Sequence, residues 1–85
     1  MKLIYSNIDL KATGENLKKI RIEKGYSVKE LQFILGLNTP QAIYKWQRGK
    51  CLPTIDNLLV ISSLFQMPIE NLLIYKIAED KIHDY

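Results

Sequence analysis

Three polar side chains, Gln41, Tyr44 and Lys45, are spaced to share one face of a short helix, while Ile43 and Trp46 face the opposite way. An amide, a phenol and an ammonium group together donate hydrogen bonds, accept them and carry positive charge, which is chemistry for binding. Catalysis is not indicated, because the sequence contains no paired nucleophile and base, no metal-ligand cluster and no glycine-rich phosphate loop.

The elements that must position these residues are predicted from their ends. Ser27 and Glu30 have the spacing of a capping box, and Gly36 suits the left-handed conformation that closes a helix. Thr39 before Pro40 predicts the start of the next helix, with the threonine hydroxyl as its cap. Two helices this short need flanking helices to complete a core. The apolar positions predicted to face that core are Leu17, Ile20, Leu31, Ile34, Leu35, Ile43, Trp46, Leu58, Ile61, Leu64, Phe65, Ile69, Leu72 and Leu73.

Four stretches carry a family pattern: NLKKIRIEKGYS, SVKELQFILGLN, AIYKWQRGKCLP and IDNLLVISSLFQMPIENLL. In them the chain resembles the Cro/cI-type helix-turn-helix domains of phage repressors and Xre regulators, most specifically in the W-x-R-G-x-x-x-P run from Trp46 to Pro53. The resemblance implies an all-α, five-helix fold. It further implies a sequence-specific DNA-binding transcriptional regulator, with repression as the preferred role, whose third helix (about residues 39–48) enters the major groove.

The predicted layout has three parts: an N-terminal arm or short strand over residues 1–12, the helix-turn-helix domain over 13–75 and a helical tail over 76–85. Thr13 is the predicted cap of the first helix, and Thr54 is the predicted cap of the fourth. The first twelve residues alternate apolar and polar side chains, but a lone strand has no partner in an all-α monomer. We therefore expect a flexible arm in preference to a strand that pairs with a second subunit.

Charge is divided unevenly along the chain, whose net charge is +3. Residues 1–50 carry ten Lys or Arg against four acids, which gives +6, whereas residues 51–85 carry two lysines against five acids, which gives −3. An uneven but solvated surface would explain the charge alone. Because the basic half coincides with the helix-turn-helix, a polyanionic partner such as DNA is favoured.

The resemblance assigns roles to individual residues of the third helix and its flanks. The expected base contacts are Gln41, Ala42, Tyr44 and Lys45, with the Gln41 amide matching adenine in the major groove. The expected contacts to the DNA backbone are Ser27, Lys29, Asn38, Thr39, Arg48 and Lys50. Ordinary surface or packing roles remain open for each of them.

The sequence departs from the family at three places. In the family an arginine that matches Arg21 usually pairs with an acid, but Gln47 stands in the acid's position, so we expect a weaker tether or another partner for Arg21. Gln32 replaces a small residue. One extra residue lies between Gly36 and Thr39, and the longer turn is expected to make room for the glutamine.

The C-terminal part of the chain is rich in apolar residues for a small monomer. Ile74, Tyr75, Ile77 and Ile82 extend the apolar pattern beyond the fifth helix. We expect a homodimer that forms through the fifth helix and the tail and presents two recognition helices about 34 Å apart, one turn of DNA. The alternative is a tail folded back over its own core.

Two other classes of function are considered as alternatives to a transcriptional regulator. One is a protein-interaction module, such as an antitoxin-like partner, that retains the fold. The other, an enzyme, is disfavoured. One cysteine, Cys51, and one histidine, His83, cannot form a disulfide framework or an ordinary zinc site in the monomer. We expect no cofactor, metal, small-molecule ligand or membrane contact, and a cytoplasmic location, because no segment has the length of a membrane span or the pattern of a signal peptide.

Overall fold

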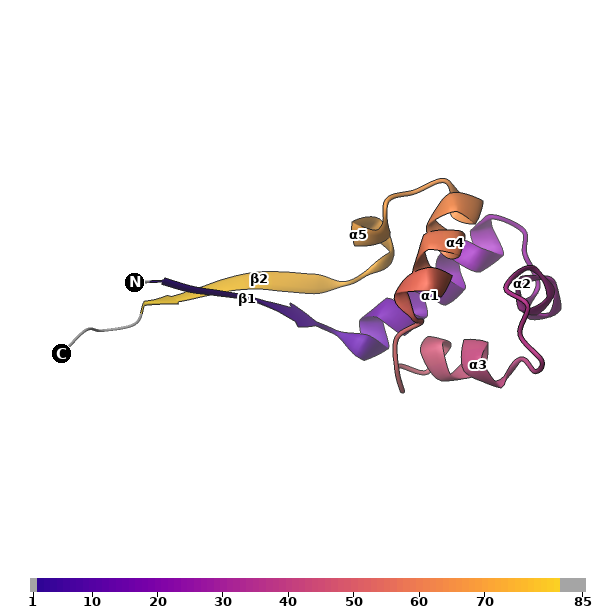
Figure 1. Ribbon diagram of the computed structural model, residues 1–85, viewed down its shortest axis with the longest axis horizontal. Coiled ribbons are helices and arrows are strands. Elements are labelled where there is room, and N and C mark those ends of the chain that lie inside the picture. Colours follow the sequence, from indigo (N-terminus) through magenta and orange to yellow (C-terminus); the bar gives the residue numbers. More distant parts are fainter. Residues whose placement is uncertain (1, 82–85) are drawn as a thin grey trace.

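The computed structural model describes residues 2–81, which form five helices and two strands. In chain order these are β1 (Lys2–Ile8), α1 (Leu10–Glu23), α2 (Val28–Ile34), α3 (Gln41–Gln47), α4 (Ile55–Phe65), α5 (Ile69–Leu72) and β2 (Tyr75–Lys81). We call the five helices the helical body and the two paired strands the ribbon. The ribbon extends away from the body, so that the molecule measures 56 × 23 × 20 Å (Figure 1). The five predicted helices are confirmed, but the expectation of an all-α fold is wrong.

The core lies within the helical body and takes residues from every helix. Its buried members are Leu17, Ile20, Leu31, Ile43, Trp46, Leu58, Ile61, Phe65 and Leu72. All nine were predicted from helical spacing. Ile34 was also predicted to face inward, but it is 41% exposed. Ile34 is the last residue of α2, a short helix in which only Leu31 is fully buried. Its side chain lines a surface hollow together with Leu59 and Val60.

Two helix starts follow the predicted caps. The Ser27 hydroxyl accepts from the Glu30 backbone N–H at 3.0 Å, and the Glu30 carboxylate accepts from the Ser27 N–H at 3.1 Å, which completes the capping box of α2. Thr54 caps α4 by accepting from the Asn57 N–H at 3.2 Å. Gly36 has a φ of 68° after α2, as the left-handed closing position requires.

Two other predicted caps are wrong. Helix α1 begins at Leu10 rather than after Thr13, because the Asp9 carboxylate accepts from the Ala12 N–H at 2.9 Å and caps the helix earlier. Helix α3 begins at Gln41, and Pro40 occupies its N-cap position without a side-chain hydrogen bond, so the Thr39 hydroxyl is not used. Proline has its φ already close to the helical value, which allows the helix to start without a hydroxyl cap.

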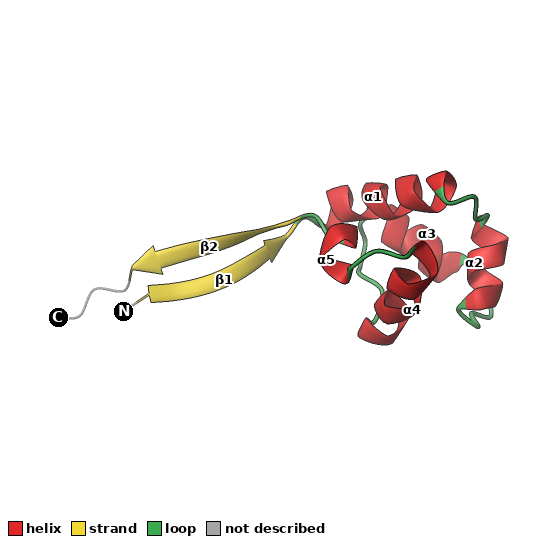
Figure 2. Cartoon of the chain, turned by 90° about the horizontal axis from the view of Figure 1, so that it is seen from above, coloured by secondary structure: helices red, strands yellow, loops and turns green. Residues whose placement is uncertain are grey.

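The ribbon joins the two ends of the chain. β1 pairs antiparallel with β2 in a register that places Tyr5 opposite Ala78 and Ile8 opposite Tyr75. Both views show the two strands side by side and clear of the helices (Figures 1 and 2). The flexible arm and the helical tail predicted from the sequence are therefore wrong for residues 2–8 and 75–81, and Ile82 and His83 lie outside the described residues.

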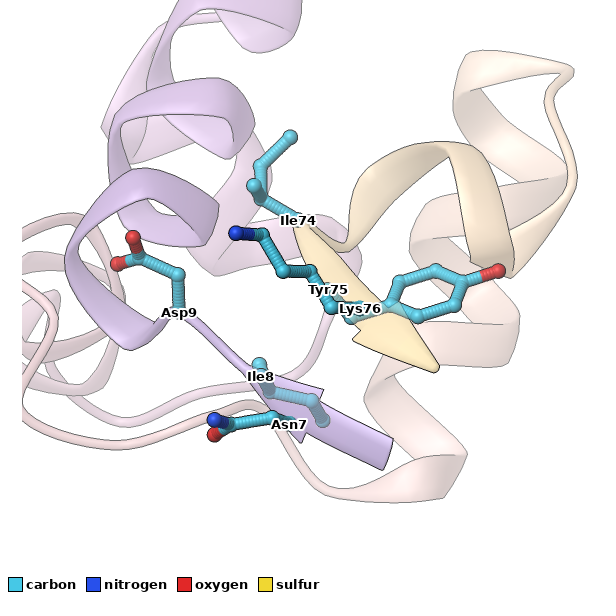
Figure 3. A pocket seen from close by; sticks show the side chains of 6 residues that line it. All are labelled: Asn7, Ile8, Asp9, Ile74, Tyr75 and Lys76. Atoms are coloured by element: carbon cyan, nitrogen blue, oxygen red, sulfur yellow. The ribbon is translucent and has the colours of Figure 1, made fainter. Parts of the chain in front are cut away.

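Hydrogen bonds from α1 explain why the chain leaves α5 as a strand. Thr13 is fully buried, and its hydroxyl accepts from the Ile74 N–H at 2.9 Å and lies 3.4 Å from the Ile74 carbonyl oxygen. That carbonyl also accepts from the Asp9 N–H at 2.9 Å. Figure 3 shows this junction, where Tyr75 and Lys76 already point to opposite sides of β2, as strand geometry requires. Ile74 is thus fixed in line with β1.

No helix within residues 2–81 is both long and apolar enough to cross a membrane.

Candidate nucleic-acid interface

Helix α3 is seated on α1 by an unusually close crossing at Gly14. A Cβ atom at that position would lie 2.2 Å from the Trp46 carbonyl oxygen and 2.7 Å from that of Gln47, both in the α3 backbone. Only glycine fits there without displacing a helix. Gly14 was not among the residues predicted to have a role, although a glycine inside a helical pattern is a signal for close backbone approach.

Packing fixes which face of α3 points outward. Ile43 is 1% exposed and Trp46 is 6% exposed, so both side chains lie in the core as predicted. Gln41, Tyr44 and Lys45 are exposed on the other side of the helix. Because α3 has only seven residues and two of them are anchored, the outward face has a single orientation relative to the body.

Arg21 holds the C-terminal end of α3 from the side of α1. Its Nε donates to the Gln47 Oε1 at 3.0 Å, and its Nη1 donates to the Tyr26 carbonyl oxygen at 2.7 Å. The side chain is almost fully buried. Of the two alternatives expected for Arg21, another partner is therefore found in the Tyr26 carbonyl oxygen, while the Gln47 amide oxygen remains a partner in the position of the family's acid.

The longer turn between α2 and α3 is also tied down. Gln32 is half buried, and its amide donates to the Leu37 carbonyl oxygen at 3.3 Å. Leu37 in turn donates its backbone N–H to the Gln32 carbonyl oxygen at 3.0 Å, which closes α2 beyond Gly36. The two residues thus fix each other across the turn that contains the insertion.

The predicted base-contacting residues differ in their exposure to solvent. Gln41, Tyr44 and Lys45 are exposed, whereas Ala42 is partly buried and packs against the core. Tyr44 retains 39% exposure. The structure therefore brings three of the four candidates together on an open face and leaves the fourth at its edge.

The predicted backbone-contacting residues are all exposed and come from three segments. They are Ser27 and Lys29 at the start of α2, Asn38 and Thr39 before α3, and Arg48 and Lys50 after it. The Ser27 hydroxyl accepts a hydrogen bond in the capping box, and its hydroxyl proton remains available to donate to a phosphate. The set surrounds α3 in sequence and is basic at both ends.

A second glycine places the loop that carries two of these residues. Gly49 has a φ of 73°, and a Cβ atom there would lie 2.6 Å from the Lys11 Cα. The loop therefore passes directly against the first turn of α1. This contact sets the position of Arg48 and Lys50 relative to the body.

The chain segment that contains α3 carries charge of one sign. No Asp or Glu occurs between Glu30 and Asp56, and this interval contains Lys45, Arg48 and Lys50. Among the described residues, the two ion pairs within 4.0 Å are Lys2 with Glu79 and Lys19 with Glu23, which leaves these three cations unneutralised by a close carboxylate. A polyanion meets an uninterrupted basic interval here.

Comparisons with known proteins agree with this architecture. A family model described as helix-turn-helix matches residues 17–72, which lie within the helical body and contain neither strand of the ribbon. The chain is 37% identical over 60 residues to the SPbeta prophage-derived HTH-type transcriptional regulator YonR of Bacillus subtilis. That match covers 71% of this chain but 55% of YonR, so the chain spans about half the length of that relative.

Solved structures share the fold. The restriction-modification controller protein C.AhdI of Aeromonas hydrophila superposes with a TM-score of 0.65 and 26% identity, over 75% of this chain and 96% of C.AhdI. The clp gene regulator ClgR of C. glutamicum superposes with a TM-score of 0.61 and 19% identity, over 73% of this chain and 79% of ClgR, and shows the fold alone. The predicted resemblance to the Cro/cI type is confirmed, and the chain belongs to the helix-turn-helix family.

Proposed function

We propose that this protein is a DNA-binding transcriptional regulator that inserts α3 into the major groove of an operator as a homodimer, and that it acts as a repressor by occupying that site. The observation that carries this proposal is the open, polar face of α3 held rigidly on a buried base of Ile43 and Trp46. A short helix with such a face has the width and chemistry that major-groove recognition requires.

Gln41 is the proposed reader of a base. It is the first residue of α3 and is exposed, so its amide meets a base edge before the rest of the helix does. Its adjacent donor and acceptor match the N6 and N7 groups of adenine, a pairing that contributes about 1–3 kcal/mol of discrimination. Tyr44 and Lys45 extend the contact along the groove, and Ala42 offers its methyl group to a thymine from the edge of the face.

The proposed phosphate contacts lie on both sides of that helix. Lys29 and Ser27 reach one strand from the start of α2, with Asn38 and Thr39 beside them, while Arg48 and Lys50 reach the backbone from the loop held by Gly49. These contacts fix register without reading sequence. The uninterrupted basic interval around α3 supports the assignment.

Selection of bound duplexes from a random DNA pool tests this function. The unchanged protein should select a palindromic consensus that contains an adenine in each half-site. The Gln41→Ala variant should lose the preference for adenine at that position. An adaptor that keeps the fold for protein binding alone would enrich no consensus. The matched control is Gln66→Ala, an exposed glutamine that follows α4, which should select the same consensus as the unchanged chain.

The homodimer needs a surface of its own. Sequence patterning placed it on the fifth helix and the tail. Helix α5 has four residues, and its Leu72 is fully buried, so it offers little free apolar surface. The tail, which is β2 in the structure, leaves Ile77 62% exposed.

A further inference from the structure

The ribbon has only two strands and exposes several large apolar side chains. Leu3, Ile4, Tyr5 and Ile77 are between 41% and 62% exposed. A two-stranded sheet alone is marginally stable in water and usually needs further strands or a packed helix. Figure 2 shows the backbone of the described ribbon meeting the body only at its base. The family match does not include either strand. We therefore expect another polypeptide segment to cover the exposed apolar side chains of the ribbon.

The two edges of the ribbon differ in composition. From Leu3 to Ile8, β1 contains no charged residue, proline or glycine, whereas β2 carries Lys76, Glu79 and Asp80. Charged residues are a common device that keeps a free strand edge from pairing with another chain. β2 has the composition of an outer strand. β1 has the composition of a central strand, although one of its edges is open.

The free edge of β1 can be identified residue by residue. The Asp9 N–H donates to the Ile74 carbonyl oxygen at 2.9 Å, which continues the register of the ribbon by one step. Hydrogen-bonded and non-bonded pairs alternate in an antiparallel ladder, so Asn7 and Tyr5 bond to β2. Ser6 and Ile4 accordingly direct their backbone N–H and C=O groups to the open side.

We propose that the open edge of β1 pairs antiparallel with β1 of a second copy of this chain, giving a four-stranded sheet in the order β2, β1, β1 and β2. The two-fold axis lies perpendicular to this sheet, so each apolar face continues into the same face of the other copy. Leu3 and Tyr5 gain cross-strand neighbours on one face, and Ile4 and Ile8 gain them on the other. The charged β2 strands become the two outer edges.

This inference names the surface of the homodimer in the proposed function and therefore rests on it. Its geometry also differs from a dimer built on helices. Antiparallel pairing places the helical bodies at opposite ends of the sheet, separated by the length of a seven-residue strand, about 23 Å. The spacing of the recognition helices is then set by the ribbon.

Sedimentation equilibrium of the full chain without DNA tests the pairing. The unchanged protein should have the mass of a dimer. Ser6→Pro removes an N–H from the open edge, twice per dimer by symmetry, without removing a bond to β2, and should weaken dimerisation at least about tenfold. Ser6→Ala keeps the N–H and should remain dimeric. Circular dichroism should show unchanged helix content in both variants.

A charge exchange makes the test independent of any proline effect. Full overlap of the two β1 strands makes the two Ser6 side chains diagonal neighbours about 7–8 Å apart on one face of the sheet. Ser6→Lys and Ser6→Glu should therefore each be monomeric alone, while an equal mixture should restore the dimer. Lys76→Glu, on the outer strand, is the matched control and should leave the mass unchanged.

A monomeric unchanged protein at high concentration, or dimers that persist in all three charged and proline variants, would overturn the proposal. In the first case another chain or the helical body would cover β1. Because no DNA is present, a dimer that selects no DNA consensus would refute only the proposed function. A DNA-binding dimer that persists in the charged and proline variants would refute only this interface, whereas a DNA-binding monomer would refute the homodimer of the proposed function as well.

Discussion

The helical body and the ribbon are stabilised in different ways. The body has nine buried apolar residues and two glycine-mediated backbone contacts, whereas the ribbon depends on its hydrogen-bond ladder and on the junction at Ile74. The body can therefore hold α3 rigidly by itself. The ribbon has an open edge and exposed apolar side chains, which are the properties of a surface that is completed on association. We infer that recognition and assembly are assigned to separate parts of one short chain.

The largest expected effect concerns the body. Gly14→Ala places a Cβ against two carbonyl oxygens of α3, at 2.2 and 2.7 Å, and should lower the free energy of unfolding by about 3 kcal/mol or more. Thermal denaturation measures this loss. Glu15 follows Gly14 in α1 but is exposed to solvent. Glu15→Ala is the control and should change stability by less than about 0.5 kcal/mol. Equal stability of the two variants would show that α1 and α3 do not cross as closely as described.

A smaller effect should be confined to the ribbon. Thr13→Val keeps the shape of a fully buried side chain but leaves the Ile74 N–H without its hydroxyl partner, a change of about 1–3 kcal/mol. Hydrogen exchange should show faster exchange in β1 and β2, while amides of α4 keep their protection. Thr39→Val, at an exposed threonine that caps no helix, should change neither. Uniform loss of protection in strands and helices would contradict the separation of the two parts.

The smallest effect strengthens the body. Gln47→Glu would give the buried Arg21 guanidinium a carboxylate oxygen in place of the present amide oxygen, which lies 3.0 Å from the Arg21 Nε. Charge-assisted hydrogen bonds exceed neutral ones, so unfolding should require about 1 kcal/mol more at neutral pH. The gain should disappear in acid as the new carboxylate is protonated. Urea denaturation at two pH values measures it, and a destabilised variant at neutral pH would mean that desolvation outweighs the added attraction.

Much of the body could be predicted because its signals are local. The Ser27 and Glu30 capping box, the Gly36 closure and the apolar spacing of Ile43 and Trp46 each depend on residues within one or two helical turns. These also suffice to place the outward face of α3. What they do not give is the depth at which Ala42 sits or the glycine contact at Gly14, since both depend on where another helix lies.

The ribbon was missed because its two halves stand at opposite ends of the sequence. The alternation in β1 was recognised, but its partner Tyr75–Lys81 has an apolar pattern that also fits a helical extension of α5. The deciding contact is between Thr13 and Ile74, which is a long-range hydrogen bond and leaves no local signal. Thr13 was predicted to be a cap because threonine is a common capping residue, but its hydroxyl binds Ile74 instead.

The central claim, that the outward face of α3 meets DNA, is tested most directly by the salt dependence of binding to the selected operator. Lys45→Ala should reduce the slope of log affinity against log salt by about one, because one phosphate-neutralising or groove-lining charge is lost. Lys19→Ala removes the same charge from an exposed position of α1, where it pairs with Glu23, and should leave the slope unchanged. Identical slopes for Lys45→Ala and the unchanged protein, with unchanged affinity, would contradict the account.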